Sequence, residues 1–126
     1  MTVDEALDRA AAVNITRIVQ VGCDLPGARW AVETAKAYDS VVAAVALHPN
    51  EAPRLAEGGT LEEALAEINV LAGSGNHIRA IGETGLDYFR TADEGRHAQH
   101  HSFHEHIRMA QRHDKRLKNK ERDAHA

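Results

Sequence analysis

The sequence lacks several features that would each have decided its class. It has one cysteine, Cys23, which excludes an intrachain disulfide and gives no support to a secreted, disulfide-stapled scaffold. No apolar run approaches the roughly 20 residues that cross a bilayer, and the first residues do not have the basic start and apolar stretch of a signal peptide. We therefore expect a cytoplasmic protein without a membrane partner.

Positive charge is scarce as well. The 126 residues include 15 lysines and arginines against 19 aspartates and glutamates, a formal net charge of −4. This balance excludes a basic protein that binds nucleic acid by charge alone. A nucleic-acid substrate stays open, because bound metal ions can supply positive charge. Apolar residues make up 43% of the chain, which is typical of one globular domain with a modest core.

Short apolar runs alternate with amphipathic segments along the chain. The runs at 15–21, 41–47 and 78–82 are typical of strands, and the continuous run 41–47 predicts a strand covered on both faces. Apolar residues at helical spacing predict four helices. Three of them begin just after Thr2, Asp24 and Thr60, and the fourth spans about 94–114. This alternation predicts an α/β fold with a parallel sheet and right-handed crossovers.

Local signals refine these boundaries. Thr2 and Thr60 are each followed three residues later by glutamate, which is the spacing of a capping box. The second helix is expected to bury Trp30 and Tyr38 on its apolar side. We expect a loop after the run 41–47, and a turn over 83–88 after the third strand.

Polar residues follow each of the three predicted strands. They are Cys23 and Asp24, then His48 and Asn50, then Glu83 and Asp87. In parallel α/β folds, sites form where the carboxyl ends of the strands converge. Three successive strands thus deliver ligand-capable side chains to one edge, and we predict the active site there.

Glu83 and His48 each allow two interpretations. Glu83 lies between Gly82 and Gly85, whose missing side chains give access to its carboxylate, and a carboxylate can ligate one divalent ion or bridge two. Alternatively, Glu83 caps the next segment or pairs with Arg90. His48 is a ligand, a phosphate contact or a general acid, or else a loop histidine bonded to the backbone.

Asp87, Tyr88 and the remaining histidines are also ambiguous. Asp87 and Tyr88 either help to position a substrate or close a turn and fill the core. Seven of the nine histidines lie from His97 onward, and the pairs 97/101 and 100/104 have the spacing that chelates Zn²⁺ or Ni²⁺. Without a third ligand at a recognisable spacing, we interpret them as a solvated helix face. Cys23 has no histidine beside it and is expected to be a small buried hydrophobe.

The stretch AIGETGLDYFR at 80–90 closely resembles a strand signature of the TatD-type deoxyribonucleases, which are metal-dependent amidohydrolase-like barrels. VGCDLPGARWAVETA at 21–35 and VVAAVALHPNEA at 41–52 resemble the second and third strands of that family, in the same order. The predicted last helix carries similar residues at Gln99, Phe103, His106 and Ala110. The resemblance runs over about 15–125.

This resemblance implies a (β/α)₈ TIM barrel that hydrolyses phosphodiester bonds, typically in DNA, with a water activated by a divalent ion. Mg²⁺ is the expected cofactor, with Mn²⁺ or Zn²⁺ as alternatives. By resemblance, Glu83 is the catalytic glutamate and a metal ligand, and His48 lies near the substrate phosphate. Asp87, Tyr88 and Arg122 complete the expected substrate-binding residues.

The sequence also departs from the family pattern. No His-x-His pair precedes Ile15, and Lys120 occupies the place of a metal-ligating histidine, where it adds positive charge. Lys118 and Lys120 also interrupt the apolar run expected of a buried fourth strand. A complete barrel needs about 250 residues. We therefore expect 1–126 to form one partial barrel of three to four parallel strands with flanking helices, a fragment whose exposed sheet edges favour self-association.

Three functional hypotheses remain open. The first is a TatD-type metal-dependent nuclease, truncated or completed by association with another chain. The second is a non-catalytic remnant or interaction module of the same fold. The third is a small α/β domain that binds a phosphate-bearing small molecule, although the sequence has no glycine-rich phosphate loop of either standard type.

Overall fold

The computed structural model describes residues 1–89, 91, 93–122 and 124, which form a parallel sheet with helices between its strands. The elements are α1 (Val3–Ala12), β1 (Ile18–Gly22), α2 (Leu25–Ala37), β2 (Val41–Val45), α3 (Glu51–Glu57), α4 (Leu61–Ala72), β3 (Ile78–Asp87), α5 (Asp93–His113) and β4 (Arg116–Arg122). The four strands lie side by side in chain order and every neighbouring pair is parallel. The predicted α/β class and parallel sheet are confirmed.

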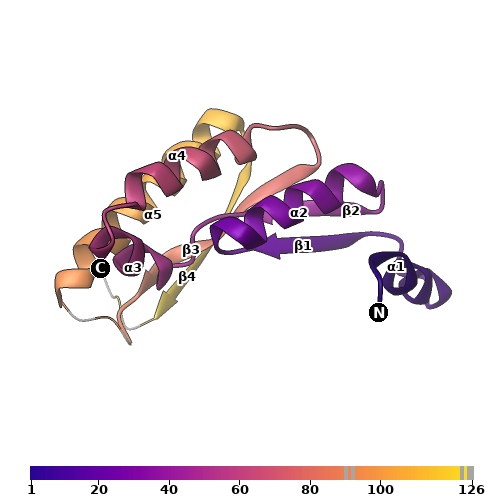
Figure 1. The fold of residues 1–126 in the computed structure, drawn as a ribbon, viewed down its shortest axis with the longest axis horizontal. Helices are drawn as coiled ribbons and strands as arrows, with labels where there is room; N and C mark the ends of the chain where they lie inside the picture. Colours follow the sequence, from indigo (N-terminus) through magenta and orange to yellow (C-terminus); the bar gives the residue numbers. More distant parts are fainter. Residues whose placement is uncertain (90, 92, 123, 125–126) are drawn as a thin grey trace.

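Helices α2, α4 and α5 lie along one face of the sheet (Figure 1). On this side Val41, Ala43 and Val45 of β2 pack into the core, and alanines along α2 let its backbone approach the strands closely. On the opposite face, Val19 and Val21 of β1 are 57% and 44% exposed. The sheet is therefore covered by helices on one side only, as in a segment of a barrel wall.

The two helices that precede and follow β1 begin at the predicted residues. Thr2 Oγ1 accepts a hydrogen bond from Glu5 N at 3.1 Å, and Asp24 Oδ1 accepts one from Gly27 N at 2.7 Å. Helix α1 nevertheless has no fully buried residue, although Leu7 packs against the core, and it lies beyond the amino end of β1 (Figure 1). In the part of the chain that the structure describes, no helix is both long and apolar enough to cross a membrane.

Three expectations about the helices are wrong. The loop expected after β2 contains helix α3, because Pro53 lies near its start, where a missing N–H costs little. Thr60 makes no side-chain cap, since its hydroxyl donates to Leu55 O at 3.4 Å instead. Trp30 is 50% exposed, because the buried side of α2 follows its small residues rather than the indole.

The turn expected over 83–88 is also wrong, because β3 continues to Asp87 and pairs with β4. The flanking glycines serve this pairing. A Cβ on Gly85, whose φ is +128°, would lie 2.0 Å from Lys120 O, and one on Gly82 would lie 2.7 Å from Lys118 Cβ. Because Gly82 and Gly85 lack side chains, β4 can pack close to β3 on either side of Glu83. This role in strand pairing comes in addition to the predicted role of giving access to the Glu83 carboxylate.

Candidate active site

The carboxyl ends of β1, β2 and β3 meet at one edge of the sheet. His48 N donates to Cys23 O at 2.8 Å, which ties the segment after β2 to the segment after β1. A backbone hydrogen bond links Glu83 to the Cys23 thiol, and the charge of Glu83 acts on that thiol. The structure thus brings together the segments that carry Cys23, His48 and Glu83, as the strand-end argument predicts.

His48 lines a hollow of about 370 Å³ at this edge. The other residues around the hollow are Val21, Gly22, Cys23, Asp24, Gly27, Asn50 and Glu51. The imidazole Nδ1 of His48 accepts a hydrogen bond from Asn50 N at 3.2 Å. This hydrogen bond from the backbone sets the orientation of the ring. It corresponds to the second interpretation of His48, a loop histidine bonded to the backbone rather than a ligand.

Cys23 is half-buried, so the expectation of a buried hydrophobe is wrong for this thiol. Burial raises its pKa, and the negative charges of Glu83 and Asp24 act in the same direction, against the hydrogen bond from the Glu83 backbone. The thiol is therefore protonated at neutral pH. It is a poor nucleophile in this setting.

Asp87 is 2% exposed, and both of its carboxylate oxygens have partners. Its Oδ2 lies 3.2 Å from Lys120 Nζ, and its Oδ1 accepts from Phe89 N at 3.2 Å. Burial alone would raise the pKa of Asp87, but these two hydrogen bonds and the charges of Lys120 and Arg122 outweigh it and lower the pKa. Asp87 is thus a buried carboxylate that holds Lys120.

Tyr88 and Arg122 lie next to each other on the paired strand ends. Tyr88 N donates to Arg122 O at 2.9 Å. Their side chains have different partners, because the Arg122 guanidinium lies 3.9 Å from the centroid of the Phe89 ring and Arg96 lies 4.5 Å from that of Tyr88. Both cations also lie near acidic groups, since Arg96 Nη1 is 3.1 Å from Asp93 Oδ1 and the charge of Arg122 acts on Asp87.

Two buried polar residues of α5 fix this edge of the sheet. Gln99 accepts from Asp87 N at 2.8 Å and donates to Asp87 O at 2.9 Å. His106 Nε2 accepts from Leu47 N at 3.0 Å, one residue before His48, while its Nδ1 donates to Ser102 O at 2.6 Å. Burial lowers the pKa of His106, so the ring is neutral.

Gln99 and His106 are functional residues that the sequence alone did not assign to the site. A signal was available, because Gln99, Ser102, His106 and Met109 share one stripe at helical spacing. Polar residues on a buried stripe require hydrogen-bond partners in the layer beneath. Here the partners are the strand ends that carry the candidate site.

The described residues do not provide a complete metal site. Over 1–89, 91, 93–122 and 124, no three His, Cys, Asp or Glu side chains gather closely enough to hold a metal ion. Glu83 has the right chemistry for a hard divalent ion, but a single carboxylate does not make a coordination shell. The alternative pairing of Glu83 with Arg90 lies outside the described residues.

The four histidines of the pairs 97/101 and 100/104 on α5 are exposed, in agreement with a solvated helix face. His101 Nε2 lies 2.5 Å from Glu62 Oε1 of α4, so this ring makes an ion pair between two helices when it is protonated. His97, His100 and His104 are at least partly exposed. No group of three potential ligands includes them in the described part of the chain.

Comparison with known proteins gives one consistent family. A profile described as "TatD related DNase" matches residues 1–126. The chain is 38% identical over 120 residues to the uncharacterized metal-dependent hydrolase TatD of Mycobacterium tuberculosis, covering 92% of this chain and 43% of that protein. It is 31% identical over 110 residues to the 3′-5′ ssDNA/RNA exonuclease TatD of Cronobacter sakazakii, covering 85% of this chain and 38% of that protein.

The fold agrees with a solved structure of the same family. YJJV, a TatD homologue from Escherichia coli K12, superposes with a TM-score of 0.70 at 25% identity, over 95% of this chain and 44% of that one. This likeness confirms the predicted partial barrel. The chain spans less than half the length of each of these relatives.

Proposed function

Because this chain belongs to the TatD-related DNase family of metal-dependent hydrolases, we propose that it takes part in hydrolysis of phosphodiester bonds in nucleic acid. The observation that carries the proposal is the meeting of the Glu83, Cys23 and His48 segments at the carboxyl edge of the sheet. The family relative named as an ssDNA/RNA exonuclease supports single-stranded nucleic acid as the substrate. One lone cysteine also fits a reducing compartment such as the cytoplasm.

In this proposal Glu83 is the catalytic glutamate and supplies one carboxylate to a divalent ion. Mg²⁺ suits a hard oxygen ligand best, with Mn²⁺ or Zn²⁺ as alternatives. The ion would stabilise charge that develops at the phosphate. No three-ligand cluster gathers among the described residues, and we propose that a second chain supplies further ligands when chains associate.

The remaining site residues receive roles that follow their contacts. His48 lines the hollow beside Cys23 and faces the substrate phosphate, while Arg122 and Tyr88 bind the nucleic acid at the neighbouring strand ends. Asp87 is too buried to touch a substrate, so it acts by holding Lys120 at the rim. Lys120 then adds positive charge for the phosphate rather than a metal ligand.

The bare face of the sheet supports self-association. Val19 and Val21 expose apolar surface on the side without helices, and β1 and β4 are the outer strands of the described sheet. We expect sedimentation to show oligomers at micromolar concentration, and Val19→Lys with Val21→Glu to shift them toward monomer. A wild-type chain that stays monomeric at 100-fold higher concentration would contradict this assembly.

Hydrolysis of labelled single-stranded DNA with Mg²⁺ or Mn²⁺ tests the function. Wild type is expected to cleave, and Glu83→Ala to lose activity by a factor of about 100 or more. Glu63→Ala is the matched control, because Glu63 is an exposed glutamate on α4, away from the strand ends. Cleavage that survives Glu83→Ala would overturn the proposal.

The second candidate is a non-catalytic module of the same fold. The absence of a three-ligand cluster in the described residues and the Lys120–Asp87 pair favour it. It predicts that protein dialysed against Mn²⁺ retains no stoichiometric amount of Mn²⁺ per chain. One tightly held ion per chain, lost in Glu83→Ala, decides for the hydrolase.

A further inference from the structure

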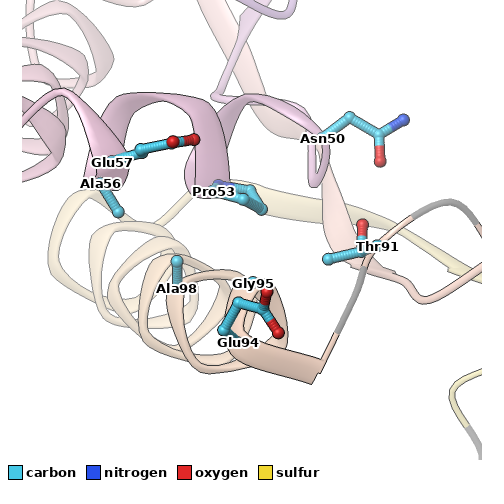
Figure 2. Close-up of a pocket in the computed structure, with 8 residues that line it drawn as sticks. All are labelled: Asn50, Pro53, Ala56, Glu57, Thr91, Glu94, Gly95 and Ala98. Carbon is cyan, nitrogen blue, oxygen red and sulfur yellow. The ribbon is translucent and has the colours of Figure 1, made fainter.

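The two sides of the sheet offer different surfaces to a partner. On the side of the helices, α3 and α5 touch at Pro53 and Gly95, where an added Cβ on Gly95 would lie 3.2 Å from Pro53 Cβ (Figure 2). Glu57 and Glu94 lie beside this contact and carry negative charge. A polyanion is therefore repelled there. The character of the opposite side, the open face of the sheet, is set by β4.

Strand β4 carries a basic residue at every second position. These residues, which we call the basic row, are Arg116, Lys118, Lys120 and Arg122. Between them, Leu117 packs against the core on the helix side. Because successive side chains of a strand point to opposite faces, Glu121 shares the side of Leu117, and the basic row projects from the open face over about 20 Å.

The register of the sheet leads to the same face. One line of paired residues crosses all four strands, through Val21, Ala44, Ala80 and Arg116. Paired residues of neighbouring strands share a face, and Val21 is 44% exposed on the side without helices, so Arg116 lies on that side as well. Three strand spacings of about 4.8 Å separate β1 from β4, which puts the basic row about 14 Å from the exposed valines. The apolar patch and the basic row are therefore two separate parts of the open face.

Neighbouring acidic groups neutralise only part of this charge. Asp87 Oδ2 lies 3.2 Å from Lys120 Nζ, and Glu83 lies at the register shift of β3 that faces Lys118. In the part of the chain that the structure describes, Arg116 and Lys118 form no ion pair within 4.0 Å. The cations of the row outnumber the two carboxylates. The open face at β4 is thus positive in a chain whose formal net charge is −4.

The basic row restricts what can bind over β4. Covering a cation with an apolar layer is costly unless an anion pairs with it, so a partner that binds there has to bring negative charge at repeated intervals. The phosphates of a nucleic-acid strand do so. At the carboxyl end of the row, the Arg122 guanidinium lies 3.9 Å from the centroid of the Phe89 ring, which is 53% exposed. A track of cations with an exposed aromatic ring is the combination that binds single-stranded nucleic acid.

We propose that the basic row of β4 is a metal-independent docking surface for single-stranded nucleic acid. The strand lies along β4, with a base at Phe89 and with phosphates that follow the row from Arg122 to Arg116. Since Arg122 and Lys120 belong to the candidate site, the row extends binding from that site toward the amino end of the sheet. As a continuation of the substrate site, this surface rests on the proposed function.

The salt dependence of binding tests the surface without hydrolysis. A fluorescent oligothymidine is titrated with the full chain in EDTA, and fluorescence anisotropy reports the bound fraction. Because Lys120 and Arg122 share the charge of Asp87, we count about three neutralised phosphates, so a rise from about 50 to about 200 mM salt should weaken binding about 20-fold. Arg116→Gln with Lys118→Gln should weaken binding at low salt and reduce that factor to about threefold.

Two further variants control for folding and for total charge. Arg9→Gln with Lys36→Gln removes the same charge from exposed residues of α1 and α2, and it should keep the salt dependence of the wild type. Arg116→Lys with Lys118→Arg keeps the charge of the row and should keep binding. Far-ultraviolet circular dichroism of the β4 glutamine variant should match wild type, because both replaced side chains are exposed.

The outcomes separate the surface from the hydrolase. Equal weakening by the two glutamine pairs would overturn the surface, and the row would then serve only to keep other strands from pairing with β4. Displacement of the oligothymidine by polyglutamate at equal charge would overturn the choice of nucleic acid in favour of an acidic protein segment. Binding as predicted by a chain that cleaves no DNA keeps the surface and rejects the hydrolase. Cleavage with an unchanged KM in the β4 glutamine variant keeps the hydrolase and rejects the surface.

Discussion

Replacing Gln99 by methionine tests how the strand ends are held in place. Gln99 is fully buried and makes three hydrogen bonds, two to the backbone of Asp87 and one to Thr91 Oγ1. Methionine has a similar volume and no amide, so packing is nearly kept while these bonds are lost.

The size of the effect follows from the groups left without partners. The Asp87 N–H and C=O remain buried, and each unsatisfied group costs about 1–3 kcal/mol. Part of this cost is relieved as α5 shifts, so we expect Gln99→Met to lose about 3 kcal/mol of unfolding free energy. For a chain of this length that is a fall in Tm of about 10 °C.

The assay is urea unfolding followed by far-ultraviolet circular dichroism at pH 7. Gln111→Met is the matched control, because Gln111 lies on the same helix with its side chain exposed, and its stability should change by less than about 0.5 kcal/mol. If Gln99→Met and Gln111→Met unfold at the same urea concentration, α5 does not hold the end of β3 and the argument is refuted.

Three further predictions concern pH and backbone packing. Because burial keeps His106 neutral, with its pKa lowered, its contribution to stability is full above the ordinary pKa of about 6.5 and is lost as the pH falls below it. His106→Gln should remove this acid sensitivity in urea titrations at pH 7 and 5, and an unchanged slope would contradict it. The pKa of Asp87 is also lowered, so its contribution is lost as the pH falls below about 3.9. Asp87→Asn should cost about 2 kcal/mol at pH 7 and flatten the acid limb, and equal stability at pH 7 would refute the Lys120 pairing. Gly85→Ala should cost about 4 kcal/mol through clash and strain, while Gly59→Ala, where nothing lies within 4 Å of the added Cβ, should cost about 1 kcal/mol in thermal unfolding. Similar losses in the two glycine variants would rule out the close approach of Lys120.

The strands and the site edge could be predicted because their signals are local. The continuous apolar run 41–47 contains β2, and polar residues directly after each strand mark its carboxyl end. Helix α3 was missed because Pro53 is usually a loop signal, and only its place near the start of the helix makes it compatible with helix. Sequence spacing does not distinguish these two contexts.

The contacts of Asp87 and Gln99 depend on tertiary structure. The sequence places Asp87 at the end of a strand, but its burial and its pairing with Lys120 exist only because β4 lies beside β3. Gln99 lies twelve residues further along and reaches back from α5 to the same backbone. No periodicity in the sequence carries this information. Whether Asp87 contacts a substrate or is a buried residue that holds Lys120 could therefore be decided only from the three-dimensional structure.

We propose that Glu83 serves hydrolysis in a site completed by association of chains, and the dependence of activity on chain concentration tests this proposal most directly. Cleavage of labelled single-stranded DNA should rise more steeply than in proportion to concentration, and Glu83→Gln should abolish it at every concentration. Activity strictly proportional to chain concentration, or unaffected by Glu83→Gln, would contradict the account.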